Sequence, residues 1–162
     1  MDYHPVVAKI LDQLKKNNFW HETFEHETVR TSEEAAKVRS GYTLNQGAKA
    51  IIVRVKEKSG NKYFLMLVLP ADQKINIDKL KIDLDAKDIR FASEDEVLEL
   101  TGGVKPGGVP PFGNLFGLKV IADPTLFENT KIIFNAGDRR FSVAMISGDY
   151  KTLVDPQITP II

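Results

Sequence analysis

The segment from Thr101 to Gly113, TGGVKPGGVPPFG, has the composition best suited to chemistry in this chain, with five glycines and three prolines. Glycine lets a ligand approach the main chain, whereas proline fixes φ and removes an N–H group. A loop rich in both is therefore stiff and exposes selected amides. Such amides can hold an anion or the oxyanion that develops during acyl transfer. A plain surface crossing between two structured segments is the alternative.

Lys49 is the second residue that calls for a chemical explanation. The run AKAIIVRVKE has the composition of a strand, and its alternation places Lys49 on the same face as Ile51 and Val53. An ammonium group on an apolar face is costly unless it is paired or reaches a polar cavity. Lys49 therefore indicates a site, and the alternative is a lysine at a strand end whose amine reaches water.

The composition excludes several kinds of enzyme. The chain has no cysteine, which rules out disulfides, thiol nucleophiles and cysteine-rich zinc sites. Its three histidines have no metal-binding spacing, and the GxSxG motif of many serine hydrolases is missing. We therefore expect neither a metal nor another cofactor.

Charge and length set the scale of any interaction. Lysine plus arginine equals aspartate plus glutamate at 22 each, so a nucleic acid contact has to be local, such as the end of a tRNA. No apolar run is long enough to span a bilayer, and the N-terminus does not have the order of a signal peptide. We expect one domain over residues 1–162, a cytoplasmic location and no membrane contact.

Periodicity and capping residues predict an α+β fold: a mixed, mostly antiparallel sheet curled toward a barrel, with surrounding helices. Two capping boxes, Thr31 with Glu34 and Ser93 with Glu96, mark helix starts. The turn Lys58-Ser59-Gly60-Asn61 joins the two strands of a hairpin, and the tail 158–162 is either an edge strand or loose. Expected helices cover 5–16, 31–38, 77–84, 93–101, 124–127 and 148–153; expected strands cover 19–26, 48–57, 62–69, 89–92, 118–121, 132–134 and 141–146.

The glycine-proline loop resembles that of the bacterial prolyl-tRNA editing family, also called YbaK-like aminoacyl-tRNA deacylases. The resemblance extends over about 19–154, and the loop residues that carry it are Gly103, Val104, Pro106, Gly107, Val109, Pro111, Phe112 and Gly113. It implies an editing-domain fold and hydrolysis of the ester of mischarged tRNA, such as tRNA(Pro) carrying alanine or cysteine. The implied partners are the 3′ end of that tRNA and prolyl-tRNA synthetase.

The resemblance also implies roles for particular residues. It makes Lys49, Gly103 and Gly102 the catalytic residues, with Lys49 holding the tRNA end and the two glycine amides facing the ester carbonyl. Phe24 and Asn135 also have purely structural interpretations, as a core aromatic residue and as a turn residue. The chain has no histidine after His26, unlike some relatives, which carry one near this turn. The implied substrate-binding residues are Phe24, Thr31, Gly107, Gly108, Val109, Pro111, Phe112, Asn135, Gly137 and Asp138.

An aminoacyl ester is labile, so placing a water molecule and stabilising the oxyanion are sufficient for hydrolysis without a metal or a triad. Two other functions remain open from the sequence. One is a module that binds a tRNA end or a synthetase without hydrolysing anything. The other is a hydrolase for a different small ester or amide.

Overall fold

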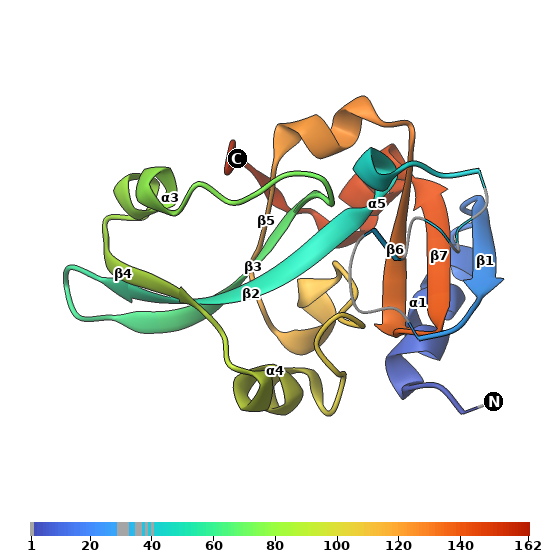
Figure 1. Ribbon diagram of the computed structural model, residues 1–162, viewed down its shortest axis with the longest axis horizontal. Coiled ribbons are helices and arrows are strands. Elements are labelled where there is room, and N and C mark those ends of the chain that lie inside the picture. Colours follow the sequence, from blue (N-terminus) through green and yellow to red (C-terminus); the bar gives the residue numbers. More distant parts are fainter. Residues whose placement is uncertain (1, 29–32, 35–36, 38, 40) are drawn as a thin grey trace.

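The computed structural model describes residues 2–28, 33, 34, 37, 39 and 41–162 (Figure 1). The described residues form an α+β fold with two sheets, neither of which closes into a barrel. A three-stranded antiparallel sheet has the order β1-β7-β6, and a five-stranded mixed sheet has the order β4-β2-β3-β5-β8. The strands are β1 (His21–Glu25), β2 (Ala48–Glu57), β3 (Lys62–Pro70), β4 (Ala86–Phe91), β5 (Val120–Ala122), β6 (Lys131–Asp138), β7 (Phe141–Ile146) and β8 (Gln157–Ile158).

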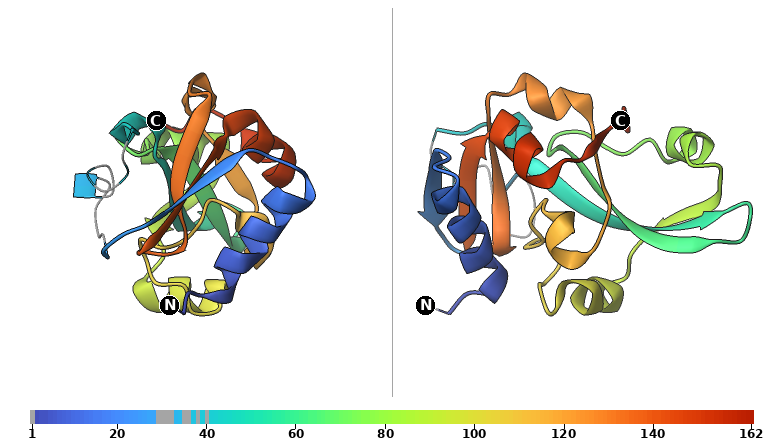
Figure 2. Two further views of the ribbon diagram at one scale, coloured as in Figure 1. Left: turned by 90° about the vertical axis from the view of Figure 1, so that its right-hand side faces the viewer. Right: turned by 180° about the vertical axis from the view of Figure 1, so that it is seen from behind.

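Helices and single turns lie around these sheets. In the rear view α1 lies across the three-stranded sheet, and the N-terminus lies beside the start of that helix (Figure 2). The α-helices are α1 (Pro5–Lys16), α3 (Ile77–Asp83), α4 (Glu94–Thr101) and α5 (Ser147–Val154); the 3-10 turns are η1 (Leu44–Gln46), η2 (Gly113–Phe116) and η3 (Pro124–Glu128). Within the described part of the chain, none of the helices has the length and apolar composition that a bilayer crossing needs.

The long β2–β3 hairpin separates two hydrophobic cores. Successive side chains of a strand point to opposite faces, so Val53 and Val55 pack into one core while Ile52 packs into the other. Met66 and Val68 of β3 join Ile52, on the side that α1 and the three-stranded sheet cover. The hairpin therefore links the two halves of the molecule.

Most predicted elements are confirmed. The hairpin and the helices at 5–16, 77–84 and 93–101 lie where expected, and the Ser93 capping box is present at the start of α4. The tail forms β8, which pairs with β5 in parallel. The helix expected at 31–38, with its capping residue Thr31, falls largely outside the described residues.

Two boundaries differ from the prediction by three residues or more. Strand β4 begins at Ala86, because it continues past a register shift between Lys56 and Glu57 in β2. The segment from Asn135 to Asp138 was predicted as a turn, but it stays in β6 and passes through a second register shift. Such irregularities insert unpaired residues, which alternation along a single strand does not reveal.

Gly137 controls how closely α1 approaches this irregular part of β6. Its φ is 117°, and a Cβ placed there would lie 2.1 Å from Cγ1 of Val6 on α1. Val6, Val7, Ile10 and Leu14 form the buried stripe of that helix. A side chain at position 137 would therefore force the helix away from the sheet.

We predict that Gly137→Ala lowers the free energy of unfolding by about 2–4 kcal/mol, because backbone strain and overpacking add. Gly117→Ala is the matched control: its φ is 69° and nothing lies within 4 Å of the added Cβ, so it should cost about 1 kcal/mol. Urea unfolding followed by circular dichroism measures both. Equal losses in the two variants would show that the helix contact is not limiting.

Candidate functional site

The glycine-proline loop begins where α4 ends. The amides of Gly102 and Gly103 both donate to the carbonyl oxygen of Leu98, the latter at 2.8 Å. Thr101 supports the same turn, since its Oγ1 accepts from the Val104 amide at 3.0 Å. The amides of Gly102 and Gly103 were expected to bind a substrate oxygen. In the structure both amides already form the hydrogen bonds that end the helix.

The far end of the loop is held in the hydrophobic core. Phe112 is fully buried, with ring centroids 5.4 Å from Phe134 and 5.5 Å from Tyr150. The Tyr150 hydroxyl donates to the carbonyl of Pro111 at 2.6 Å, and Pro111 is itself buried. The side chains of Pro111 and Phe112, expected to bind substrate, thus anchor the loop and are covered by protein.

The middle of the loop is pinned to β6 and to the turn that follows it. Asn135 Nδ2 donates to the Gly107 carbonyl at 2.6 Å, and Arg139 Nε donates to the Pro106 carbonyl at 2.7 Å. The Gly108 amide donates to the main-chain carbonyl of Lys105 at 2.9 Å. No hydrogen bond to a described residue occupies the amides of Gly107 or Val109. The amides of Lys105, Phe112 and Gly113 also make no hydrogen bond to a described residue, but Phe112 and Gly113 are buried. We take Gly107 and Val109 as the candidate donors because they lie at the point where Asn135 holds the loop.

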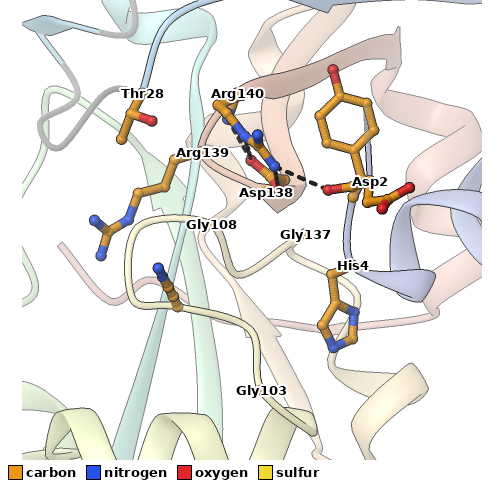
Figure 3. Close-up of a pocket in the computed structure, with 11 residues that line it drawn as sticks. Asp2, His4, Thr28, Gly103, Gly108, Gly137, Asp138, Arg139 and Arg140 are labelled. Atoms are coloured by element: carbon orange, nitrogen blue, oxygen red, sulfur yellow. Dashed lines mark hydrogen bonds and ion pairs between the residues drawn. The ribbon is translucent and has the colours of Figure 1, made fainter.

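A cavity of about 590 Å³ opens on one side of the loop (Figure 3). Its walls are the N-terminal segment 2–4, Thr28, the loop at 103–108 and the turn at 137–140. The structure therefore brings together four of the expected site residues, Gly103, Gly108, Gly137 and Asp138.

Asp138 is committed to its neighbour Arg140. Its two carboxylate oxygens accept from Arg140 Nε at 2.9 Å and Nη2 at 2.8 Å. These hydrogen bonds hold the pKa of Asp138 below its usual range. Arg140 also donates to the main-chain carbonyl of Asp2 at 3.1 Å, which ties the N-terminal segment to the turn (Figure 3). Asp138 thus lines the cavity with a carboxylate whose charge is already paired with that of Arg140.

A partly buried polar cluster, which we call the Arg39 network, lies beside the Gly107 carbonyl. It consists of Arg39, Asn135, Ser142 and His26. Arg39 donates through Nη2 to Asn135 Oδ1 at 2.9 Å and through Nε to Ser142 Oγ at 3.0 Å. Ser142 Oγ also lies 2.8 Å from His26 Nε2. Asn135, which donates to Gly107, is thus the link between the loop and the network.

Arg39 is the unusual member of this network, because only 7% of the residue is exposed. Burial lowers the pKa of its guanidinium to about 10. Within the described part of the chain no carboxylate lies in ion-pair distance of it. A buried cation of this kind marks a place where a polar or anionic group can be bound. Sequence reasoning missed Arg39 and Ser142, since neither belongs to a recognisable spacing.

Lys49 lies at the start of β2, where it is half-buried and donates to the carbonyl of Gln73 at 2.7 Å. Burial lowers the pKa of its amine, and the charges of Glu33 and Asp72 partly offset that effect. Gly47, two residues earlier, would place a Cβ 3.9 Å from Arg39 Nη1. The structure thus puts this end of β2 near the Arg39 network, and Lys49 is not among the residues that line the cavity beside Gly103.

Phe24 lies on β1, opposite Ser142 of β7 in the register. Its ring packs edge-on against Tyr42, with centroids 5.8 Å apart. It therefore contributes to the surroundings of the Arg39 network by packing. Thr31, expected to bind substrate, is outside the described residues.

His4 connects α1 to the loop. Its Nδ1 accepts from the Val6 amide at 3.1 Å and so caps the helix, which leaves the proton on Nε2. Nε2 then donates to the Gly102 carbonyl at 2.9 Å. One imidazole thus fixes both the helix start and the loop start.

Comparison with known proteins identifies the family of this chain. The model of the aminoacyl-tRNA editing domain family matches residues 26–153. The chain is 39% identical to the multifunctional Ser/Thr-tRNA deacylase ProXp-y of Escherichia coli K12, over 82% of this chain and 78% of that protein. It is 28% identical to the prolyl-tRNA editing protein ProX of Acetoanaerobium sticklandii, over 95% and 92%.

The fold has solved counterparts. The crystal structure of a candidate trans-editing enzyme for prolyl tRNA synthetase superposes with a TM-score of 0.80, covering 99% of this chain and 98% of the other at 22% identity. Family model and sequence similarity together define a tRNA-editing domain. The chain belongs to the aminoacyl-tRNA editing domain family, and so to the hydrolase class of the aminoacyl-tRNA deacylases.

We predict that two substitutions of His4 separate its two roles. His4→Ala removes the cap and the contact with Gly102, and should cost about 1–3 kcal/mol of unfolding free energy. His4→Asn keeps a good capping residue but is too short to reach Gly102, so it should cost about 1 kcal/mol. Hydrogen exchange at the Gly103 and Val104 amides should accelerate in both variants. Unchanged exchange in His4→Asn would show that the loop start does not depend on this contact.

Proposed function

We propose that this protein is a trans-acting editing enzyme that hydrolyses the ester of tRNA charged with a wrong small amino acid. The observation that carries the proposal is the position of the free Gly107 and Val109 amides, in a loop pinned to a buried cationic network. Family membership supports the reaction class. A non-catalytic module that binds the tRNA end is the alternative, and the deacylation experiment below distinguishes the two.

The chemistry needs little from side chains. Water adds to the ester carbonyl carbon, and the resulting oxyanion is stabilised by the Gly107 and Val109 amides. The ribose oxygen then leaves with a proton, which gives free amino acid and uncharged tRNA. One positioned amide donor contributes roughly a hundredfold to a thousandfold in rate. The vicinal hydroxyl of the terminal ribose is available to position the water, so no base from the protein is required.

Lys49 is proposed to hold the 3′-terminal nucleotide. Its amine is partly desolvated and contacts the Gln73 carbonyl, so it sits in a defined place at the start of a rigid strand. A positioned ammonium group at this end of β2 would orient the terminal adenosine.

The side chain of the amino acid is proposed to face the Arg39 network. Asn135 and Arg39 offer polar atoms there, so a hydroxyl group on the substrate would be hydrogen-bonded whereas a methyl group would not. Sites that hydrogen-bond a substrate group discriminate better than sites that sense size alone. Serine and threonine are therefore proposed ahead of alanine and cysteine. The name of the Escherichia coli relative, a Ser/Thr-tRNA deacylase, supports this order.

The tRNA and any partner are suggested by other relatives. ProX is named as a prolyl-tRNA editing protein, and the structural neighbour is described in relation to prolyl tRNA synthetase. We propose tRNA(Pro) among the substrates and prolyl-tRNA synthetase as a partner. Alanyl and cysteinyl tRNA(Pro) accordingly belong in the substrate panel.

We predict that the protein releases labelled serine or threonine from tRNA at least about tenfold faster than alanine or cysteine. Arg39→Met should lower kcat/KM for the seryl ester by about 10–100-fold and change that for the alanyl ester by less than about threefold, because only the former loses a hydrogen-bond partner. Arg54→Met on β2 is the control. Equal losses on both esters would assign Arg39 a purely structural role. A wild-type protein that binds tRNA without accelerating ester decay would favour the binding module.

We further predict that Lys49→Met lowers kcat/KM for mischarged tRNA by about tenfold or more, with an unchanged circular dichroism spectrum. Lys56→Met on the same strand should keep wild-type activity, since Lys56 lies at the other end of β2. If Lys49→Met retains full activity, Lys49 does not hold the tRNA end.

A further inference from the structure

The cavity beside the loop contains two cations, Lys105 and Arg139, that form no ion pair with a described carboxylate, although the charge of Lys105 contributes to the lowered pKa of Asp138. Asp138 pairs with Arg140, but neither Lys105 nor Arg139 forms an ion pair within the described part of the chain. Lys105 is exposed and Arg139 is half-buried, and both line the cavity. The carboxylate of Asp2, the other acid there, is exposed. An anionic group in this cavity would therefore meet two available cations.

Arg139 is held in a fixed orientation. Its Nε donates to the Pro106 carbonyl at 2.7 Å, and a Cβ on Gly107 would approach that same Nε to 3.4 Å. Its terminal amino groups make no hydrogen bond to a described residue. In Figure 3 the guanidinium group of Arg139 points away from the paired Arg140. An arginine anchored by Nε with its terminal groups free is well suited to bind a phosphate.

We propose that Lys105 and Arg139 bind a backbone phosphate of the single-stranded 3′ end of tRNA, upstream of the terminal ribose. This inference rests on the proposed function and deepens it, since it assigns a second subsite to the same substrate. The loop connects the two subsites: Gly108 lines the cavity, while the adjacent Gly107 contacts Asn135 of the Arg39 network.

Size and charge support this assignment. A volume of about 590 Å³ lies within the range of small-ligand pockets and accommodates a nucleotide. The chain as a whole has no net charge, so it has no general field for a polyanion and needs local cations for each phosphate. Main-chain walls at Gly103 and Gly108 let a sugar-phosphate backbone approach closely.

The first test measures binding without chemistry. The probe is a fluorescein-labelled, uncharged RNA hairpin ending in single-stranded CCA, titrated by anisotropy over a series of salt concentrations. Lys105→Ala should raise Kd by about 3–10-fold and reduce the slope of log K against log salt by about one. Arg139→Gln should act in the same direction. Lys87→Ala, on β4 at the edge of the other sheet, is the control and should match wild type.

The second test compares two substrates that differ in phosphates. An aminoacylated hairpin carries the upstream phosphates, whereas an aminoacyl-adenosine carries none. Lys105→Ala should reduce kcat/KM about tenfold on the hairpin, and the reduction should disappear on the adenosine ester. Equal reductions on both substrates, or no change in the salt slope of binding, would overturn the phosphate subsite.

The two proposals fail in different ways. If the wild-type protein binds the hairpin with a salt slope that depends on Lys105 but hydrolyses neither ester, the phosphate subsite stands and the proposed function falls. If it hydrolyses both esters and Lys105→Ala leaves hairpin binding unchanged, the proposed function stands and the subsite falls. Competition by inorganic phosphate as strong as by the CCA hairpin would also overturn a site built for tRNA.

Discussion

The hydrogen bond from Asn135 to the Gly107 carbonyl, 2.6 Å long, is the contact on which the geometry of the site depends. It joins the middle of the glycine-proline loop to β6, while the core residue Phe112 and the end of α4 hold the two ends of the loop. Because the loop is held at three points, the free amides of Gly107 and Val109 have defined directions. Preorganised donors stabilise a developing charge more effectively than mobile ones do.

The same asparagine belongs to the Arg39 network, so the loop and a buried cation share one support. Burying a guanidinium without a carboxylate is unfavourable for stability, and the lowered pKa of Arg39 reflects that cost. Its neighbours compensate in part, since Asn135 and Ser142 both accept its hydrogen bonds. A buried cation whose charge is only partly compensated by its neighbours is typical of a ligand-binding site.

The loop also divides the site into two sides with different chemistry. Toward Asn135 lie polar groups suited to an amino acid side chain, and toward Arg139 lie unpaired cations suited to a phosphate. An aminoacyl-tRNA end presents both groups on either side of one ribose. Under the proposed function, two weak local contacts of this type would let a chain with no net charge select a tRNA terminus without a large basic surface.

Much of the fold and part of the site could be predicted from the sequence. The hairpin of β2 and β3, α1 and the capped start of α4 follow from alternation, helical spacing and Ser93, because these signals are local. The glycine-proline composition identified the loop, and strand alternation identified Lys49, as features that need a chemical reason. The family assignment rested on the same loop residues.

Tertiary structure alone decided which groups of the loop are available and what surrounds them. The amides of Gly102 and Gly103 donate hydrogen bonds to the Leu98 carbonyl, and the side chain of Phe112 lies in the core. Composition reveals neither fact. Arg39 and Ser142 are 103 residues apart and have no shared motif, so only the tertiary fold places them in contact. Hydrogen-bond occupancy and burial are properties of neighbours in space, whereas a sequence records only neighbours along the chain.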